Sequence, residues 1–142
     1  MSIEAEAVEL ANHELYAAVE AADLDRMAEV WLDGPHAETV VCVHPGWPAI
    51  QGREEVLRSW TAIMANTPYI QFFLTDVEVE VVGEIAVVTC AENILTGMGE
   101  SALAGGRAVA TNVFRHTASG WRLWIHHASP VITPAEGTDD SS

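Results

Sequence analysis

The stretch GWRLWIHHASP, residues 120–130, decides the fold of this chain. Its aromatic and β-branched residues follow a glycine turn and stop at a proline, which is typical of a strand inside a sheet. Because side chains alternate across a strand, we expect Trp124 and His126 to share one face and His127 to lie on the other. The two histidines then point apart, which weakens any site that needs both, although a β-bulge would reverse the assignment.

The residues before this stretch predict further strands. Residues 70–82 include alternating apolar and polar side chains, and residues 85–96 are nearly continuously apolar. With the turn at Gly83-Glu84 between them, the two stretches indicate an antiparallel hairpin. A loose glycine-containing connection over 97–106 precedes another strand over 107–116. Together with residues 120–130, these strands predict a meander.

The first half of the chain has a helical period instead. Apolar residues recur every three or four positions over 3–22, 24–31 and 52–67, and Asp23 is placed to cap the second of these helices. A short strand is expected over 39–43. The loop His44-Pro45-Gly46-Trp47-Pro48 follows it, and its two prolines restrict the backbone around a large aromatic side chain.

Composition limits the class of protein. With 142 residues, of which 49% are hydrophobic, we expect one domain over 1–132 and a disordered acidic tail over 133–142. The net charge of −15, with six arginines and no lysine, opposes binding to nucleic acid or to an anionic membrane. Five glutamates within the first 22 residues fit neither a secretory signal nor a membrane span, so we expect a cytoplasmic protein.

The element order resembles the nuclear transport factor 2-like superfamily in its SnoaL-like branch, over roughly residues 5–131. The resemblance is most specific at residues 23–25 (Asp-Leu-Asp), 52–54 (Gly-Arg-Glu), 111–114 (Thr-Asn-Val-Phe) and 121–129. It implies an α+β fold in which a curved antiparallel sheet wraps around three N-terminal helices, a cystatin-like cone with a ligand pocket at its open end. Members include isomerases, cyclases, dehydratases, epoxide hydrolases and structural association domains, so the fold does not identify a reaction.

Large side chains on the helix stripes should point into such a cone. We expect Trp31, Trp60 and Met64 to line its interior and Trp47 to close its mouth. The alternative is that these residues belong only to the core. Resemblance to the kinase-association members of the family places Asn112 and His126 in the pocket, with Trp124 on the same face of the last strand.

Histidine is the preferred acid or base near neutral pH, and His44 and His126 are the catalytic candidates. In the family the short first strand lies beside the last strand, which would bring His44 near His126. The alternative is that each imidazole only satisfies a buried backbone group. His44 stands where ketosteroid isomerase-like members often carry an aspartate, so a steroid-isomerase mechanism is not expected.

Glu92 is a carboxylate inside an otherwise apolar strand. If it faces the pocket, burial would raise its pKa and make it a general base; the alternative is a structural pair with an arginine. The histidine spacing predicts no metal site, and Cys42 and Cys90 form no metal or redox motif. No phosphate-binding loop or serine elbow occurs, and no cofactor is expected.

Two classes of function remain. The first is binding of a small, largely apolar molecule, with cofactor-free isomerase, cyclase or dehydratase chemistry if there is a reaction; the second is a non-catalytic binding or assembly module. Both faces of the strand over 85–96 are mostly apolar, whereas three helices cover only one face of a sheet. We therefore expect a homodimer through the outer face.

Overall fold

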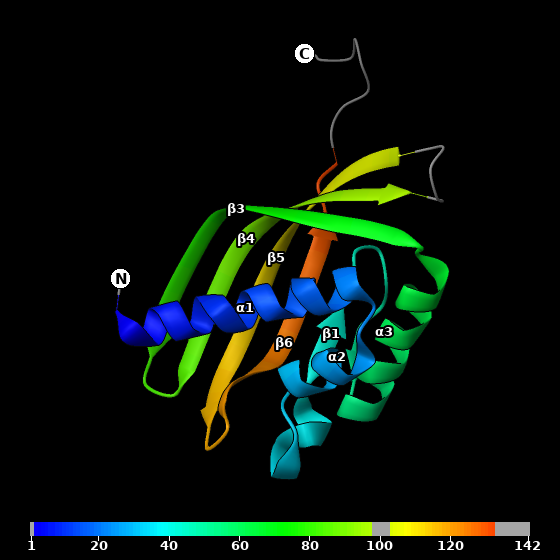
Figure 1. The fold of residues 1–142 in the computed structure, drawn as a ribbon. Helices are drawn as coiled ribbons and strands as arrows, with labels where there is room; N and C mark the ends of the chain where they lie inside the picture. Colours follow the sequence, from blue (N-terminus) through cyan, green and yellow to red (C-terminus); the bar gives the residue numbers. More distant parts are fainter. Residues whose placement is uncertain (1, 98–102, 133–142) are drawn as a thin grey trace.

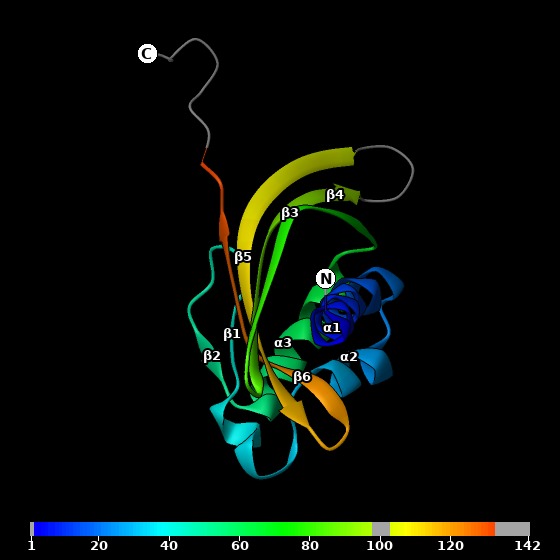
Figure 2. The ribbon, with the colours of Figure 1, turned by 90° about the vertical axis from the view of Figure 1, so that its left-hand side faces the viewer.

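The computed structural model describes residues 2–97 and 103–132. A six-stranded, strongly curved sheet carries the three α-helices on its concave side (Figures 1 and 2). In chain order the elements are α1 (Ile3–Ala21), α2 (Leu24–Val30), the 3₁₀ helix η1 (Gly34–Thr39), β1 (Val41–Val43), β2 (Ile50–Gln51), α3 (Arg53–Asn66), β3 (Tyr69–Val82), β4 (Ile85–Gly97), β5 (Leu103–Thr117) and β6 (Gly120–Pro130).

The strand order across the sheet is β2-β1-β6-β5-β4-β3. Neighbouring strands are antiparallel except β1 and β6, which are parallel, with Cys42 opposite His126. This is the predicted α+β cone. The expected loose connection over 97–106 is wrong in its second part, because Leu103–Gly106 already pair with β4. Residues 98–102 and the expected tail over 133–142 lie outside the described residues.

A tight connection joins the first two helices. Ala22 ends α1 in a left-handed conformation, and Asp23 N–H donates back to the Ala18 carbonyl oxygen at 3.0 Å. The Asp23 carboxylate then accepts from Arg26 N–H at 3.1 Å, as expected for the cap of α2. Arg26 also binds Glu14 of α1 at 2.7 Å, which holds the two helices as a hairpin.

Arg53, the first residue of α3, ties this hairpin to the rest of the fold. Its guanidinium donates to the carbonyl oxygens of Ala28 and Trp31, both at 2.8 Å. These carbonyls belong to the end of α2, where backbone acceptors lack partners inside the helix. The Gly-Arg-Glu sequence at the start of α3 thus stabilises a second helix.

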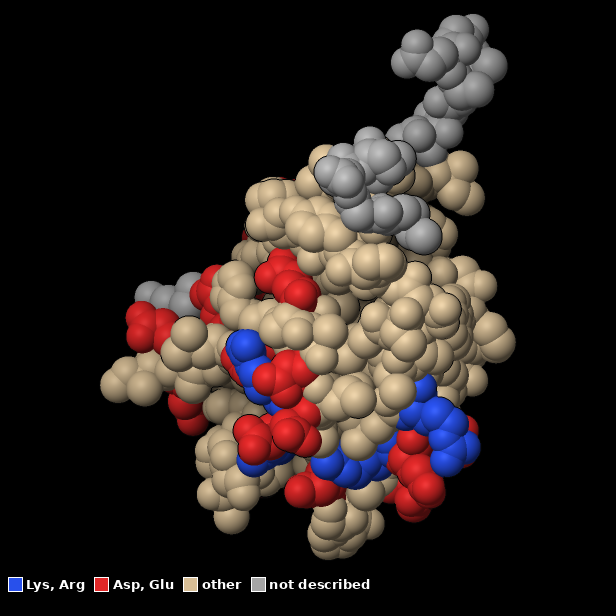
Figure 3. Space-filling view, turned by 45° about the vertical axis from the view of Figure 1, so that its right-hand side comes forward, with Lys and Arg blue, Asp and Glu red and all other residues tan. Residues whose placement is uncertain are grey.

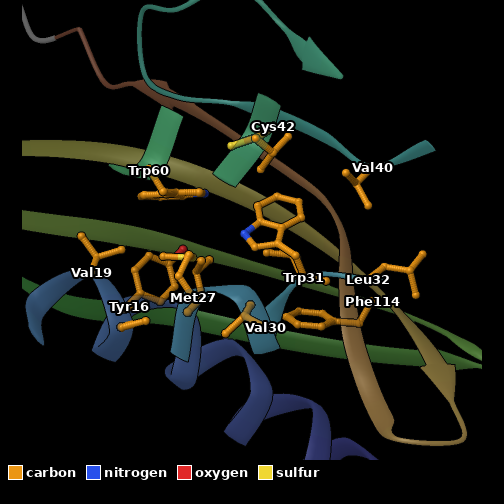
Figure 4. Close-up of a cluster of buried hydrophobic side chains, with 14 of the residues drawn as sticks. Tyr16, Val19, Met27, Val30, Trp31, Leu32, Val40, Cys42, Trp60 and Phe114 are labelled. Carbon is orange, nitrogen blue, oxygen red and sulfur yellow. The ribbon is translucent and has the colours of Figure 1, made fainter. Parts of the chain in front are cut away.

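The core lies between the helices and the concave face of the sheet (Figure 4). Alternate residues of β4 point into it, with Ala86 and Val88 fully buried, and Phe114 of β5 is also fully buried. Trp31 is among the largest side chains with no exposed surface. Its indole occupies the centre of the cluster rather than a cavity wall.

A β-bulge at Trp124 changes the facing expected for β6. Val113 pairs with Ile125, but Phe114 pairs with Leu123, so Trp124 is the extra residue. Leu123 and His126 consequently both point inward, although strict alternation places them on opposite faces. The expectation that Trp124 shares the pocket face with His126 is therefore wrong.

Trp124 instead belongs to the outer side of the sheet. Its Nε1–H donates to Thr39 Oγ1 at 2.9 Å, and the Arg115 guanidinium lies 4.9 Å from the indole centroid. The strand expected over 39–43 would begin at Thr39. This residue is instead the last residue of η1, and the strand begins at Val41. The 3₁₀ helix extends to Thr39, so β1 begins two residues later than expected.

Charged side chains gather in the lower half of the surface view in Figure 3, where arginines lie among acidic residues.

In residues 2–97 and 103–132 no helix has the length and apolar character needed to cross a membrane.

Candidate functional site

A cavity of about 180 Å³ opens between the helices and the concave side of the sheet. Most of its wall is aromatic or aliphatic, with a few polar groups. The lining residues come from α1, α3, β3, β4, β6 and the loop after β1: Tyr16, Val19, His44, Pro45, Trp47, Trp60, Ile63, Ile70, Phe72, Glu92, Ile94 and His126. An apolar pocket with a few converging polar groups is the usual form of a small-molecule site.

A chain of hydrogen bonds runs behind this wall. The Tyr16 hydroxyl donates to Glu92 Oε2 at 2.6 Å and accepts from Asn112 Nδ2 at 3.2 Å. Asn112 Oδ1 lies 2.6 Å from His126 Nδ1. Asn112 Nδ2 also donates to Asn12 Oδ1 at 2.8 Å. All five side chains are buried, so the chain is held by the protein and not by solvent.

His44 lines the cavity from the loop that follows β1. Its Nε2 lies 2.9 Å from Ser59 Oγ, and its ring packs edge-on against Trp47 and Trp60, with centroids 4.8 and 4.5 Å away. The centroids of His44 and His126 are 6.4 Å apart. The parallel pairing of β1 with β6 brings these two histidines together, because His44 directly follows β1.

Burial sets the protonation of these groups. Desolvation lowers the pKa of His44 to about 4, and desolvation together with the neighbouring His44 and His127 lowers the pKa of His126 to about 3. Both imidazoles are therefore neutral at pH 7. Desolvation raises the pKa of Glu92, against the hydrogen bond from Tyr16, which lowers it. Glu92 is thus the wall group whose pKa moves toward neutrality.

The structure brings five of the expected site residues to the cavity wall: His44, Trp47, Trp60, Glu92 and His126. Trp47 is 43% exposed in the loop at the mouth. Asn112 is fully buried behind His126 and reaches the cavity through it. No arginine pairs with Glu92 in the described part of the chain; its partner is Tyr16.

Three other expected residues lie elsewhere. Trp31 is entirely in the core, and Trp124 is on the outer side because of the bulge in β6. Met64 packs against the core and is absent from the cavity wall. Helical periodicity places a side chain on the inner stripe, but whether it meets a neighbour or a void depends on the packing.

Sequence reasoning missed Asn12 and Tyr16. Both lie on the buried stripe of α1, one turn apart, and together they anchor the hydrogen-bond chain. A signal was present, because two polar groups four residues apart on an otherwise apolar helix face indicate a buried polar network. Among residues 2–97 and 103–132, no three His, Cys, Asp or Glu side chains are grouped as metal ligands.

The model of the SnoaL-like domain matches residues 8–133. The chain belongs to the SnoaL-like domain family. This match covers α1 from Val8 onward, all of α3 and all six strands, so the hydrogen-bond chain lies wholly inside the SnoaL-like domain.

Solved structures agree with this assignment. An NTF2-like protein from Streptomyces avermitilis, described as a candidate dehydratase, is 52% identical, with a TM-score of 0.86 over 92% of this chain and 98% of that one. A candidate calcium/calmodulin-dependent protein kinase type II association domain from Thiobacillus denitrificans is 31% identical, with a TM-score of 0.75 over 87% of this chain and 94% of that one.

A more distant relative is longer. The Arabidopsis thaliana F-box protein SKIP8 is 25% identical over 121 residues, which make up 85% of this chain and 48% of that protein. The chain thus spans about half the length of this relative.

Proposed function

We propose that this SnoaL-like domain binds a small, largely apolar molecule in its cavity and moves a proton on it without a cofactor. The observation that supports the proposal most is the chain Glu92–Tyr16–Asn112–His126, which joins two polar wall groups through buried hydrogen bonds. A purely structural core has no need to expose a carboxyl and an imidazole to an apolar cavity.

The roles follow from the protonation states. Glu92 is the base, because burial raises its pKa while Tyr16 holds the carboxyl in position. His126 and His44 are neutral and act as hydrogen-bond partners of the ligand, which differs from the catalytic role that their residue type suggested. Proton removal by Glu92 and return of that proton at another carbon atom would make the reaction an isomerisation. Return of the proton to a hydroxyl group, which then leaves as water while a double bond forms, would make it a dehydration.

The size of the cavity limits the enclosed part of the ligand. A closed cavity of about 150 Å³ holds a benzene ring, so about 180 Å³ encloses one ring or a compact bicycle. A larger ligand would extend past Trp47 at the mouth.

The test has two stages. A metabolite library is first screened by thermal shift, because a ligand that binds the native state raises the melting temperature. Each binder is then incubated with the protein in D2O, and deuterium incorporation is followed by mass spectrometry. We expect incorporation with the wild type and with the control His127→Gln, whose side chain is exposed on the opposite face, and none with Glu92→Gln.

If binders are found but gain no deuterium and are not converted, the protein binds small molecules without catalysing a reaction. If no binder is found, both the proposed ligand binding and the proposed proton transfer are wrong.

Association is the second candidate function. The outer face of the sheet is only partly covered, with Phe73 and Val109 52% and 49% exposed. The similar protein from Thiobacillus denitrificans is described as an association domain. We propose that this face pairs two copies of the chain.

A further inference from the structure

The hydrogen bonds behind the cavity fix which atoms of His126 a ligand meets. Asn112 Nδ2 carries two hydrogens, and both are donated, one to Asn12 Oδ1 and one to Tyr16 Oη. Asn112 Oδ1 has no hydrogen and must accept from His126 Nδ1. His126 is therefore the neutral tautomer with its proton on Nδ1, which leaves the lone pair of Nε2 as the free polar site of a ring that lines the cavity.

The same reasoning fixes His44. The Ser59 hydroxyl donates its hydrogen to the Val56 carbonyl oxygen at 2.7 Å. Ser59 Oγ must then accept from His44 Nε2–H. The lone pair of His44 is on Nδ1. The thiol of Cys42 lies 3.9 Å from this atom and 3.6 Å from Nε2, and a thiol at 3.9 Å is a weak donor at the limit of its range.

Three further polar side chains of the wall, those of Tyr16, Trp60 and Glu92, also offer no hydrogen-bond donor to a ligand when Glu92 is ionised. Tyr16 uses its only hydroxyl hydrogen on Glu92 Oε2, so this donor is not available to a ligand. The Nε1–H of Trp60 is buried inside the wall. Glu92 Oε1 has no hydrogen-bond partner in the described part of the chain and, when Glu92 is ionised, is a further acceptor.

The described residues of the wall carry no positive charge. No arginine is among its residues, and burial keeps both histidines neutral. A carboxylate placed in this cavity would lose its hydration and meet acceptors without a counter-ion, which is strongly unfavourable.

We propose that the cavity selects uncharged rings that carry a hydroxyl group and rejects carboxylates of the same shape. This deepens the proposed function and rests on it. A ligand hydroxyl donates to His126 Nε2 or His44 Nδ1, whereas an ether in its place leaves a buried acceptor unpaired. Sites built around a hydrogen bond to the substrate discriminate strongly against analogues that lack it.

Three probes with one ring system and different 2-substituents test the proposal: 2-naphthol, 2-methoxynaphthalene and 2-naphthoate, each measured by calorimetry at pH 7. We expect 2-naphthol to bind at least about tenfold more tightly than either of the others. In His126→Phe, which removes the acceptor, the ratio of 2-naphthol to 2-methoxynaphthalene affinities should fall severalfold. In His127→Phe, on the exposed face of the same strand, the ratio should stay at its wild-type value.

Equal affinities for the three probes, with each of them shifting the His126 resonances, would overturn the inference and leave small-molecule binding intact. Failure of all three to bind at millimolar concentration would overturn the inference together with binding of ring-sized molecules. A third readout needs no ligand: long-range ¹H–¹⁵N spectra should show Nδ1–H on His126 and Nε2–H on His44. The opposite tautomer on His126 would remove the basis of the proposal.

Discussion

His126 and Asn112 face each other on paired strands, with His126 Nδ1 2.6 Å from Asn112 Oδ1. Asn112 also holds Asn12 and Tyr16, so one amide joins a strand, a helix and the imidazole of the site. The orientation of His126, and with it the chemistry of the cavity wall, depends on this single side chain.

Replacement of Asn112 by leucine should destabilise the protein. The change leaves Asn12 Oδ1 and His126 Nδ1 without a buried partner, while Tyr16 keeps its bond to Glu92. Each unpaired buried group costs about 1–3 kcal/mol, so we expect a loss of about 3 kcal/mol in the free energy of unfolding. Denaturant titration measures it. Asn93→Leu is the matched control, because Asn93 lies on the outer side of β4 and bonds only to Phe73 and Thr75 there. Equal losses for both variants would show that the buried network contributes no special stability.

The stability of the protein should fall between pH 6.5 and pH 4. The native pKa values of His44 and His126, about 4 and about 3, lie below the value of about 6.5 in the unfolded chain. The unfolded state therefore binds more protons in this window. Each histidine lowers the free energy of unfolding by about 1.4 kcal/mol for each pH unit by which the pH falls.

His126→Gln should reduce the slope of unfolding free energy against pH by about one proton. Thr111→Gln, at an exposed site on the neighbouring strand, removes no titratable group and should leave the slope unchanged. An unaltered slope in His126→Gln would mean that His126 titrates normally in the native state.

Tyr16→Phe should raise the pKa of Glu92. The Tyr16 hydroxyl stabilises the ionised carboxyl through its hydrogen bond, so its removal leaves desolvation unopposed. Carbon-13 NMR of the Glu92 carboxyl measures the titration, and any reaction that uses Glu92 as a base should shift its pH profile upward by the same amount. Tyr69→Phe is the control, since the Tyr69 hydroxyl is exposed and bonds to Gln71. A downward shift would contradict the assigned direction of the bond.

Trp47 should report ligand binding. It is partly exposed at the mouth and contacts His44, so a bound ligand should quench its fluorescence or shift the emission to the blue. We expect Trp47→Phe to lose most of the response and Trp124→Phe, on the outer side, to keep it. A full response in Trp47→Phe would show that the loop is only structural.

The protein should be a dimer at micromolar concentration. Light scattering coupled to size exclusion should give twice the 15.3 kDa of one chain. Val109→Glu places a charge on the exposed outer face and should yield monomer, whereas Leu10→Glu, at an exposed site on α1, should not. A wild-type mass of one chain would exclude pairing through the sheet.

The sequence by itself determined most of the individual elements. Apolar periods gave the three α-helices and the strands of the meander, and Asp23 marked the start of α2. Alternation placed His126 and His127 on opposite faces, and the family resemblance placed His126 inside; the structure buries His126 and exposes His127, because both residues follow the bulge. Such patterns depend on the local geometry of the backbone, which neighbouring residues specify.

The sequence also named five residues of the cavity wall, but only the tertiary structure decided which of the other candidates reach it and how its polar groups are paired. The bulge at Trp124 comes from the register between β5 and β6, which no local pattern reveals, and it moved this indole out of the pocket. The bonds from Tyr16 to Glu92 and from Asn112 to Asn12 join residues 76 and 100 positions apart. Partners at such separations meet because the sheet curves around α1, and the packing of these layers fixes which polar groups are paired and which face the cavity.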